Sequence, residues 1–150
     1  MGHQLDDGTV ITESTAICRY LESIYPEPNL FGESPIEIAS IEMWQARIYN
    51  ELMIPLAMGF RHLHPAMSGL ETQNKDYGEQ QKKIGIKSLN YFNGVLSESE
   101  FVAGDRYTFA DIQMITTTDF FIGLNQLNLG DYPEIERHTR LMSERPSFTA

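Results

Sequence analysis

The residues best suited to chemistry in this sequence are Glu13 and Ser14, which stand where a short predicted strand passes directly into a predicted helix. The first backbone N–H groups of a helix lack partners and carry the positive end of the helix dipole. A carboxylate can therefore bind there beside the Ser14 hydroxyl. The Glu13 carboxylate can accept hydrogen bonds from an ammonium group. The pair thus predicts a site for the amino and carboxylate end of an α-amino acid.

The same two residues also have a simpler interpretation. Serine is a common helix N-cap, and an acidic residue beside a helix start is often only solvated. Spacing alone leaves both interpretations open.

Local sequence predicts the elements that position this pair. Asp7-Gly8 favours a turn, and the residues Thr9 to Thr12 are β-branched at every position, which favours a strand. From Ser14 the apolar residues recur at helical spacing until Pro26. We expect the strand to have no partner within this sequence.

Two segments resemble the cytosolic glutathione transferases, in particular their bacterial members. The first runs from Gly8 to Glu22 and is followed by Tyr25-Pro26 and Leu30-Phe31-Gly32. In the family, the Glu-Ser pair that matches Glu13 and Ser14 holds the γ-glutamyl end of glutathione. The second segment, Phe101 to Ile112, resembles the signature of the family's helical domain. The resemblance implies glutathione as co-substrate and an electrophilic small molecule as its reaction partner.

The resemblance also implies a mainly α fold. We expect a glutathione transferase C-terminal-like bundle of four to five helices over residues 32–150. Residues 1–31 would be the C-terminal remnant of the thioredoxin-like glutathione-binding domain, with one strand and one helix. The family's thiol-activating Tyr, Ser or Cys normally precedes this region. We therefore expect a truncated chain with impaired conjugation, and we identify no catalytic residue in it.

Helical periodicity and prolines predict the course of the bundle. A long helix begins at Pro35, and Pro55 should kink or end it. Residues 61–69 are expected to form a connection. Further helices are predicted over about residues 74–97, 109–124 and 133–144. Thr108 and Asp111 have the spacing of a helix capping box, which is a structural role.

The family's electrophile site is walled by the helix after the linker, so the resemblance alone nominates six residues as substrate-binding. These are Met43, Trp44, Arg47, Arg61, His62 and His64. Core packing and surface solvation explain them equally well.

Two other candidate chemistries receive little support. His62 and His64 could ligate a metal only in an extended segment, and no cysteine pair completes a site, so we expect no metal. Cys18 lies past the first turn of its helix, where a small hydrophobic role is favoured over a nucleophilic one.

Composition narrows the possible partners. The 150 residues carry a formal net charge of -10, with 11 Lys and Arg, which argues against a nucleic-acid surface. No apolar stretch is long enough to cross a membrane, and one cysteine suits a reducing compartment, so we expect a cytoplasmic protein. A homodimer is expected by resemblance. The alternative function is a non-catalytic helical module that binds a ligand or a protein.

Overall fold

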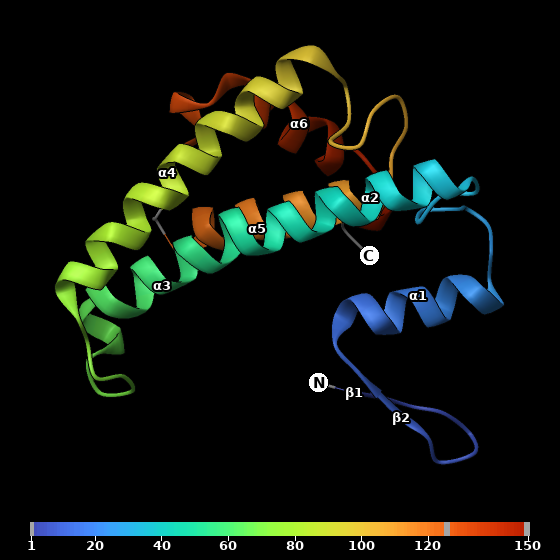
Figure 1. Ribbon diagram of the computed structural model, residues 1–150, viewed down its shortest axis with the longest axis horizontal. Coiled ribbons are helices and arrows are strands. Elements are labelled where there is room, and N and C mark those ends of the chain that lie inside the picture. Colours follow the sequence, from blue (N-terminus) through green and yellow to red (C-terminus); the bar gives the residue numbers. More distant parts are fainter. Residues whose placement is uncertain (1, 125–126, 149–150) are drawn as a thin grey trace.

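The computed structural model describes residues 2–124 and 127–148, so residues 1, 125–126 and 149–150 of the predicted domains lie outside it. A hairpin of β1 (Gly2–Gln4) and β2 (Val10–Thr12) leads into α1 (Ser14–Ile24), and this unit lies below a bundle of helices (Figure 1). The bundle consists of α2 (Pro35–Arg47), α3 (Ile54–Leu63), α4 (Lys75–Glu98), α5 (Phe109–Gly123) and α6 (Pro133–Ser143). The predicted mainly α fold is confirmed.

The prediction that the first strand lacks a partner is wrong. β1 pairs antiparallel with β2, with His3 opposite Ile11. The Asp7-Gly8 turn closes the hairpin, because Gly8 adopts a positive φ of 86° and the Asp7 carboxylate accepts a hydrogen bond from the Thr9 N–H at 2.9 Å. The sequence signal for β1 is weak because Gly2-His3-Gln4 contains no β-branched residue.

The predicted long helix from Pro35 is present, and Pro55 changes its winding without ending it. A π-helical segment, η1 (Ile48–Met53), joins α2 to α3, and Pro55 lies in the first turn of α3. Proline cannot donate the backbone hydrogen bond of a regular α-helix, and a wider turn is one way to accommodate that loss. The three segments follow one another as a single rod (Figure 1).

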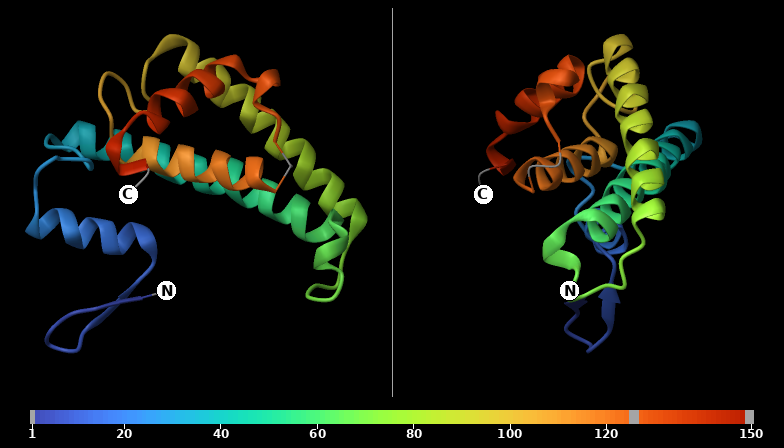
Figure 2. Two further views of the ribbon diagram at one scale, coloured as in Figure 1. Left: turned by 180° about the vertical axis from the view of Figure 1, so that it is seen from behind. Right: turned by 90° about the vertical axis from the view of Figure 1, so that its left-hand side faces the viewer.

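α3 packs closely along α4, as the views in Figure 2 show from two further sides. Close approach requires glycine, because a Cβ on Gly85 would lie 2.7 Å from Leu56 Cδ2. α3 continues to Leu63, so the predicted connection over residues 61–69 is wrong for Arg61, His62 and Leu63, which are helical. The sequence does contain a signal for this helix, because the apolar residues Phe60 and Leu63 flank the polar pair at helical spacing. The prediction of a connection gave that spacing too little weight.

The core lies between α5 and the helices around it. α5 occupies a central position, with Ala110, Met114 and Phe121 fully buried, as its apolar sequence predicts. The capping box between Thr108 and Asp111 is present at its start. None of the described helices is long and apolar enough to cross a membrane.

A candidate ligand cleft at the start of helix α1

The entrance to α1 is built by a single residue of unusual backbone conformation. β2 ends at Thr12 and α1 begins at Ser14, so Glu13 alone must turn the chain. Glu13 adopts φ 67° and ψ 121°, and within the described chain it is the one non-glycine residue at positive φ. Such a conformation costs about 1–3 kcal/mol and persists where the surrounding structure enforces it.

The entrance is not capped by the protein itself. Glu13 is the N-cap residue and makes no side-chain cap hydrogen bond, while Ser14 is already the first helical residue. Both side chains are exposed, and no hydrogen bond joins either one to another part of the described chain. The interpretation of Ser14 as an N-cap is therefore wrong, and the N–H groups of the first turn stay available to an anion.

This entrance opens on a cleft of about 630 Å³ between α1 and two helices of the bundle. We call it the entrance cleft. Its α1 side contains Glu13, Ser14, Thr15 and Cys18, and the opposite wall is formed by residues of α2, η1 and α5. The wall residues are Gln45, Ala46, Tyr49, Phe109, Ile112, Gln113 and Thr116. The cleft can hold an amino acid end at α1 and a second group against the helical wall.

Cys18 lines the entrance cleft but is poorly suited to nucleophilic chemistry. Burial raises the pKa of its thiol above the ordinary value of 9.0. No opposing effect from a nearby cation lowers it. The thiol is therefore protonated near neutral pH.

The structure directs the nominated α2 residues elsewhere. The Arg47 guanidinium lies 5.2 Å from the Trp44 ring centroid and donates a hydrogen bond to the Tyr91 hydroxyl of α4. Met43 is 43% exposed. None of Met43, Trp44 and Arg47 borders the entrance cleft.

The nominated residues at the end of α3 are also engaged in local contacts. Arg61 donates from Nε and Nη2 to the Glu71 carboxylate at 2.8 and 2.9 Å. The His62 ring nitrogen Nδ1 accepts a hydrogen bond from the Asn74 N–H at 3.2 Å. Over residues 2–124 and 127–148, no group of three or more His, Cys, Asp or Glu residues could hold a metal ion.

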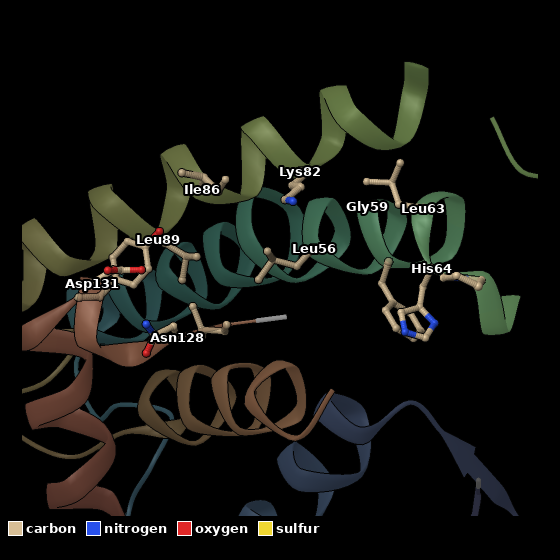
Figure 3. Close-up of a pocket in the computed structure, with 13 residues that line it drawn as sticks. Leu56, Gly59, Leu63, His64, Lys82, Ile86, Leu89, Asn128 and Asp131 are labelled. Carbon is tan, nitrogen blue, oxygen red and sulfur yellow. The ribbon is translucent and has the colours of Figure 1, made fainter. Parts of the chain in front are cut away.

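His64 borders a second cavity, also of about 630 Å³, between α3, α4 and the segment after α5 (Figure 3). Its ring stacks on Phe60 with centroids 4.6 Å apart. Leu56, Leu89 and Lys82 contribute to the lining. This cavity does not include Glu13 or Ser14, so the structure does not bring His64 together with these two residues.

Sequence reasoning named Tyr49 as a possible residue of an acceptor pocket but missed the other residues of the helical wall, among them Gln45, Gln113 and Thr116. Gln45 and Tyr49 are four residues apart, and Gln113 and Thr116 are three apart, so each pair shares one face of its helix. That spacing was available as a signal. Choosing the face required knowledge of where α1 lies.

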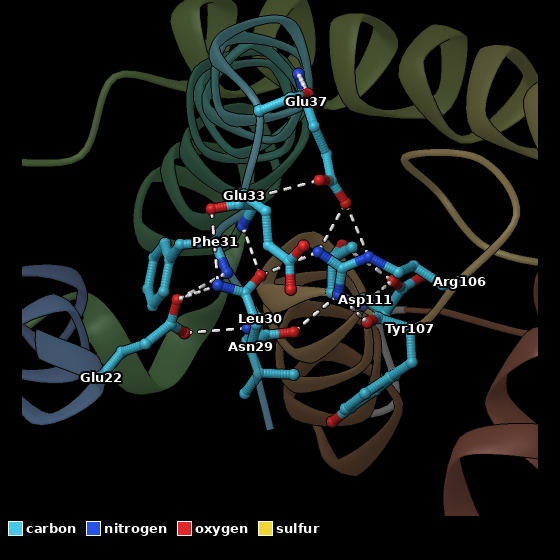
Figure 4. A network of polar contacts seen from close by, with 12 residues as sticks. Glu22, Asn29, Leu30, Phe31, Glu33, Glu37, Arg106, Tyr107 and Asp111 are labelled. Atoms are coloured by element: carbon cyan, nitrogen blue, oxygen red, sulfur yellow. Dashed lines mark hydrogen bonds and ion pairs between the residues drawn. The ribbon is translucent and has the colours of Figure 1, made fainter. Parts of the chain in front are cut away.

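A network of polar contacts holds α1 in place (Figure 4). The Glu22 carboxylate of α1 accepts hydrogen bonds from the backbone N–H groups of Leu30 at 2.9 Å and Phe31 at 3.1 Å. Arg106 donates to the carbonyl oxygen of Asn29 at 2.6 Å and to Glu37 Oε1 of α2 at 2.6 Å. The linker is thus fixed to α1 at one end and to α2 and the segment before α5 at the other.

Replacing Glu37 with glutamine should change the pH dependence of stability. The Glu33 N–H and the Arg106 guanidinium hold the pKa of Glu37 below its ordinary value of 4.5. A lowered folded-state pKa contributes stability above pH 4.5 that is lost as the pH falls through the folded value. The stability difference between wild type and Glu37→Gln should therefore be largest at neutral pH and shrink below pH 4.5, as measured by urea unfolding across the acid range.

The control for this prediction is Glu79→Gln, at an exposed position of α4. A difference between Glu37→Gln and wild type that is independent of pH would contradict the assigned role.

Comparison with known proteins identifies the family. Residues 50–146 match the family model of the glutathione S-transferase C-terminal domain, and residues 4–29 match that of the N-terminal domain. The chain belongs to the glutathione S-transferase family. The two matches lie on either side of residues 31 and 32, and the domain boundary placed there remains a prediction.

Individual glutathione S-transferases resemble the chain over nearly its whole length. Glutathione S-transferase 2 of Saccharomyces cerevisiae is 36% identical over 148 residues, covering 96% of this chain. The chain spans 63% of the length of that relative. GstA of Escherichia coli O157:H7 is 29% identical over 95% of the chain and 66% of its own length.

Solved structures in the family have the same fold. The crystal structure of Gtt2 from Saccharomyces cerevisiae superposes with a TM-score of 0.89 at 32% identity, covering 99% of this chain and 72% of that one. A glutathione S-transferase domain-containing protein of Marinobacter aquaeolei gives a TM-score of 0.85 at 34% identity, with 98% and 73% covered. The predicted membership in the glutathione transferases is thereby confirmed.

Proposed function

We propose that this chain binds glutathione by its γ-glutamyl end at the entrance to α1. The Glu13 carboxylate receives the ammonium group, and the Ser14 hydroxyl and the first N–H groups of α1 receive the carboxylate. The observation that carries the proposal is that this entrance is uncapped by side chains and lies on the entrance cleft. Family membership supports the same ligand.

The proposed reaction is conjugation of glutathione to an electrophilic small molecule. The sulfur must be deprotonated to attack, so a conjugating site needs a group that stabilises the thiolate. Among the described residues of the entrance cleft there is no Lys, Arg or His, and the Cys18 thiol is itself protonated. The hydroxyl groups of the cleft are those of Ser14, which the proposal assigns to the ligand carboxylate, and of Thr15, Tyr49 and Thr116. We therefore propose that this chain by itself binds glutathione more readily than it turns over an electrophile.

Calorimetric titration with glutathione tests the binding proposal. We expect Glu13→Ala and Ser14→Ala each to weaken binding about tenfold, because hydrogen bonds to charged groups contribute about 1.5–3 kcal/mol and solvent screens part of that. Glu79→Ala, at an exposed position far along the chain in α4, serves as control and should bind like wild type. Equal affinities for all four proteins would refute the site.

A non-catalytic helical binding module remains the second candidate function. The cleft composition favours it, because binding an amino acid end does not require a thiol-activating group. Tight glutathione binding without measurable conjugation of a chromogenic electrophile would support this candidate. Robust turnover that is abolished by a single substitution in the described cleft would instead support a complete enzyme.

The proposal extends to a homodimer that forms through α2 and α4. Tyr77, Ile84 and Tyr91 recur at intervals of seven along α4 and are 39%, 41% and 41% exposed, and Met43 of α2 is 43% exposed. An exposed apolar stripe on a helix is typical of an association surface. Sedimentation equilibrium of the chain tests this assembly. A cytoplasmic location stays a prediction from the sequence.

A further inference from the structure

Two side-chain amides on the helical wall of the entrance cleft lack hydrogen-bond partners. Gln45 of α2 is 7% exposed, and its Nε2 is buried without a partner among the residues that the structure describes. Gln113 of α5 presents a buried Oε1, also without a partner. Both residues line the entrance cleft opposite Ser14. Two residues that line the same cleft thus carry one unsatisfied donor and one unsatisfied acceptor.

Unpaired polar atoms of this kind are uncommon, because a buried polar group that loses its water without gaining a partner is costly. Some other buried polar side chains of the bundle are satisfied internally, whereas His138 Nδ1, Thr139 Oγ1 and Arg145 Nε also lack partners among the described residues. Thr118 donates to the carbonyl oxygen of Met114 at 3.1 Å, and Ser88 donates to the carbonyl oxygen of Glu51. Gln45 and Gln113 differ from these in that both residues line the entrance cleft.

We infer that Gln45 and Gln113 recognise a carboxamide or amide group of the ligand that occupies the entrance cleft. The carbonyl oxygen of such a group accepts from Gln45 Nε2, and its N–H donates to Gln113 Oε1. Rotation of a glutamine carboxamide by 180° exchanges its donor and its acceptor, so the ligand amide can bind in either orientation. An aliphatic group at the same place would leave both glutamine atoms unpaired, and the site would discriminate against it.

This inference rests on the proposed function, because it takes the amino acid end of glutathione to be held at Glu13 and Ser14. The ligand amide then has two possible sources. It is either the peptide backbone of glutathione or an amide-bearing group attached to the glutathione sulfur, as in a conjugate of an unsaturated amide. Both present the same chemistry to Gln45 and Gln113.

Two S-substituted glutathiones of nearly equal size separate these sources. S-(2-carbamoylethyl)glutathione carries a terminal carboxamide, and S-butylglutathione replaces it with an aliphatic end. Their affinities, and that of glutathione itself, are measured by calorimetry for wild type, Gln45→Met and Gln113→Met. Gln80→Met, at an exposed position of α4, is the matched control. Urea unfolding of each variant checks that the fold is retained.

We expect wild type to bind the carbamoylethyl compound about tenfold more tightly than the butyl compound, as two hydrogen bonds of ordinary strength imply. Either cleft variant should reduce that preference to about threefold or less, because one of the two hydrogen bonds is lost, and Gln80→Met should keep it. If wild type shows no such preference and glutathione affinity falls about tenfold in both cleft variants, the peptide backbone is the amide that is bound. Unchanged glutathione affinity assigns the recognition to the group on sulfur.

The inference is overturned if the cleft variants bind all three compounds as wild type does, because a buried water would then satisfy the two glutamines. Failure of the proposed function has a different signature. In that case wild type binds neither glutathione nor either S-substituted form, and the inference falls with it.

Discussion

Replacing Asp111 with alanine should lower the free energy of unfolding by about 3–5 kcal/mol, the range expected when one partner of a buried polar network is removed. The Asp111 side chain is fully buried at the start of α5. Its carboxylate oxygens accept hydrogen bonds from the Val102 N–H at 2.8 Å and the Thr108 N–H at 2.9 Å. The Thr108 hydroxyl donates to it at 3.1 Å, and His138 Nε2 lies 3.0 Å from Oδ1. Alanine would leave these groups buried without an acceptor.

The size of the effect follows from the position of Asp111 as well as from its hydrogen bonds. The carboxylate connects the start of α5 to the segment at Val102 and to α6 through His138, so three parts of the bundle share one acceptor. Loss of the carboxylate therefore affects packing between elements as well as the helix cap. An ordinary exposed N-cap substitution costs only about 1 kcal/mol.

Urea unfolding followed by circular dichroism measures the change. Asp119→Ala is the matched control, because Asp119 lies two turns along the same helix and is exposed. It should shift stability by no more than about 0.5 kcal/mol, as is usual for surface substitutions. Similar midpoints for Asp111→Ala and Asp119→Ala would show that the buried carboxylate does not stabilise the bundle.

Gly32→Ala should destabilise the chain by about 3 kcal/mol. Gly32 adopts φ 98°, a region that L side chains rarely enter at a cost of roughly 1–2 kcal/mol. A Cβ at this position would also lie 2.8 Å from the Ile38 backbone nitrogen and 3.1 Å from the Glu37 carbonyl carbon. Because these are backbone atoms of α2, the clash adds roughly 1–3 kcal/mol by overpacking.

Gly94→Ala provides a control for which the expected change in stability has the opposite sign. Gly94 lies in α4, and a Cβ there would meet nothing within 4 Å. Alanine is favoured over glycine inside a helix, so this variant should be more stable by roughly 0.5–1 kcal/mol. Thermal unfolding of both variants should therefore move the midpoints in opposite directions. A Gly32→Ala protein as stable as wild type would contradict the linker geometry.

Most of the fold could be predicted from the sequence because its signals are local. α4 begins directly after its N-cap Asn74, close to the start predicted at about residue 74, and Pro133 lies in the first turn of α6. The Gly8 turn and the capping residues Thr108 and Asp111 also act within a few positions of the chain. The errors concern segments whose structure depends on contacts with another element. β1 is stabilised by pairing across a turn, and Arg61 and His62 are helical because α3 packs on α4.

The sequence by itself determined the family and the strand-to-helix entrance at Glu13 and Ser14, because residue types at short fixed spacings specify turns, caps and helix starts. Tertiary structure alone decided which helix faces meet that entrance. Periodicity shows that Gln45 and Tyr49 share a face, but only the orientation of α1 against α2 and α5 makes that face a wall of the entrance cleft. Contacts between residues distant in the chain set that orientation, through Glu22, Asn29 and Arg106.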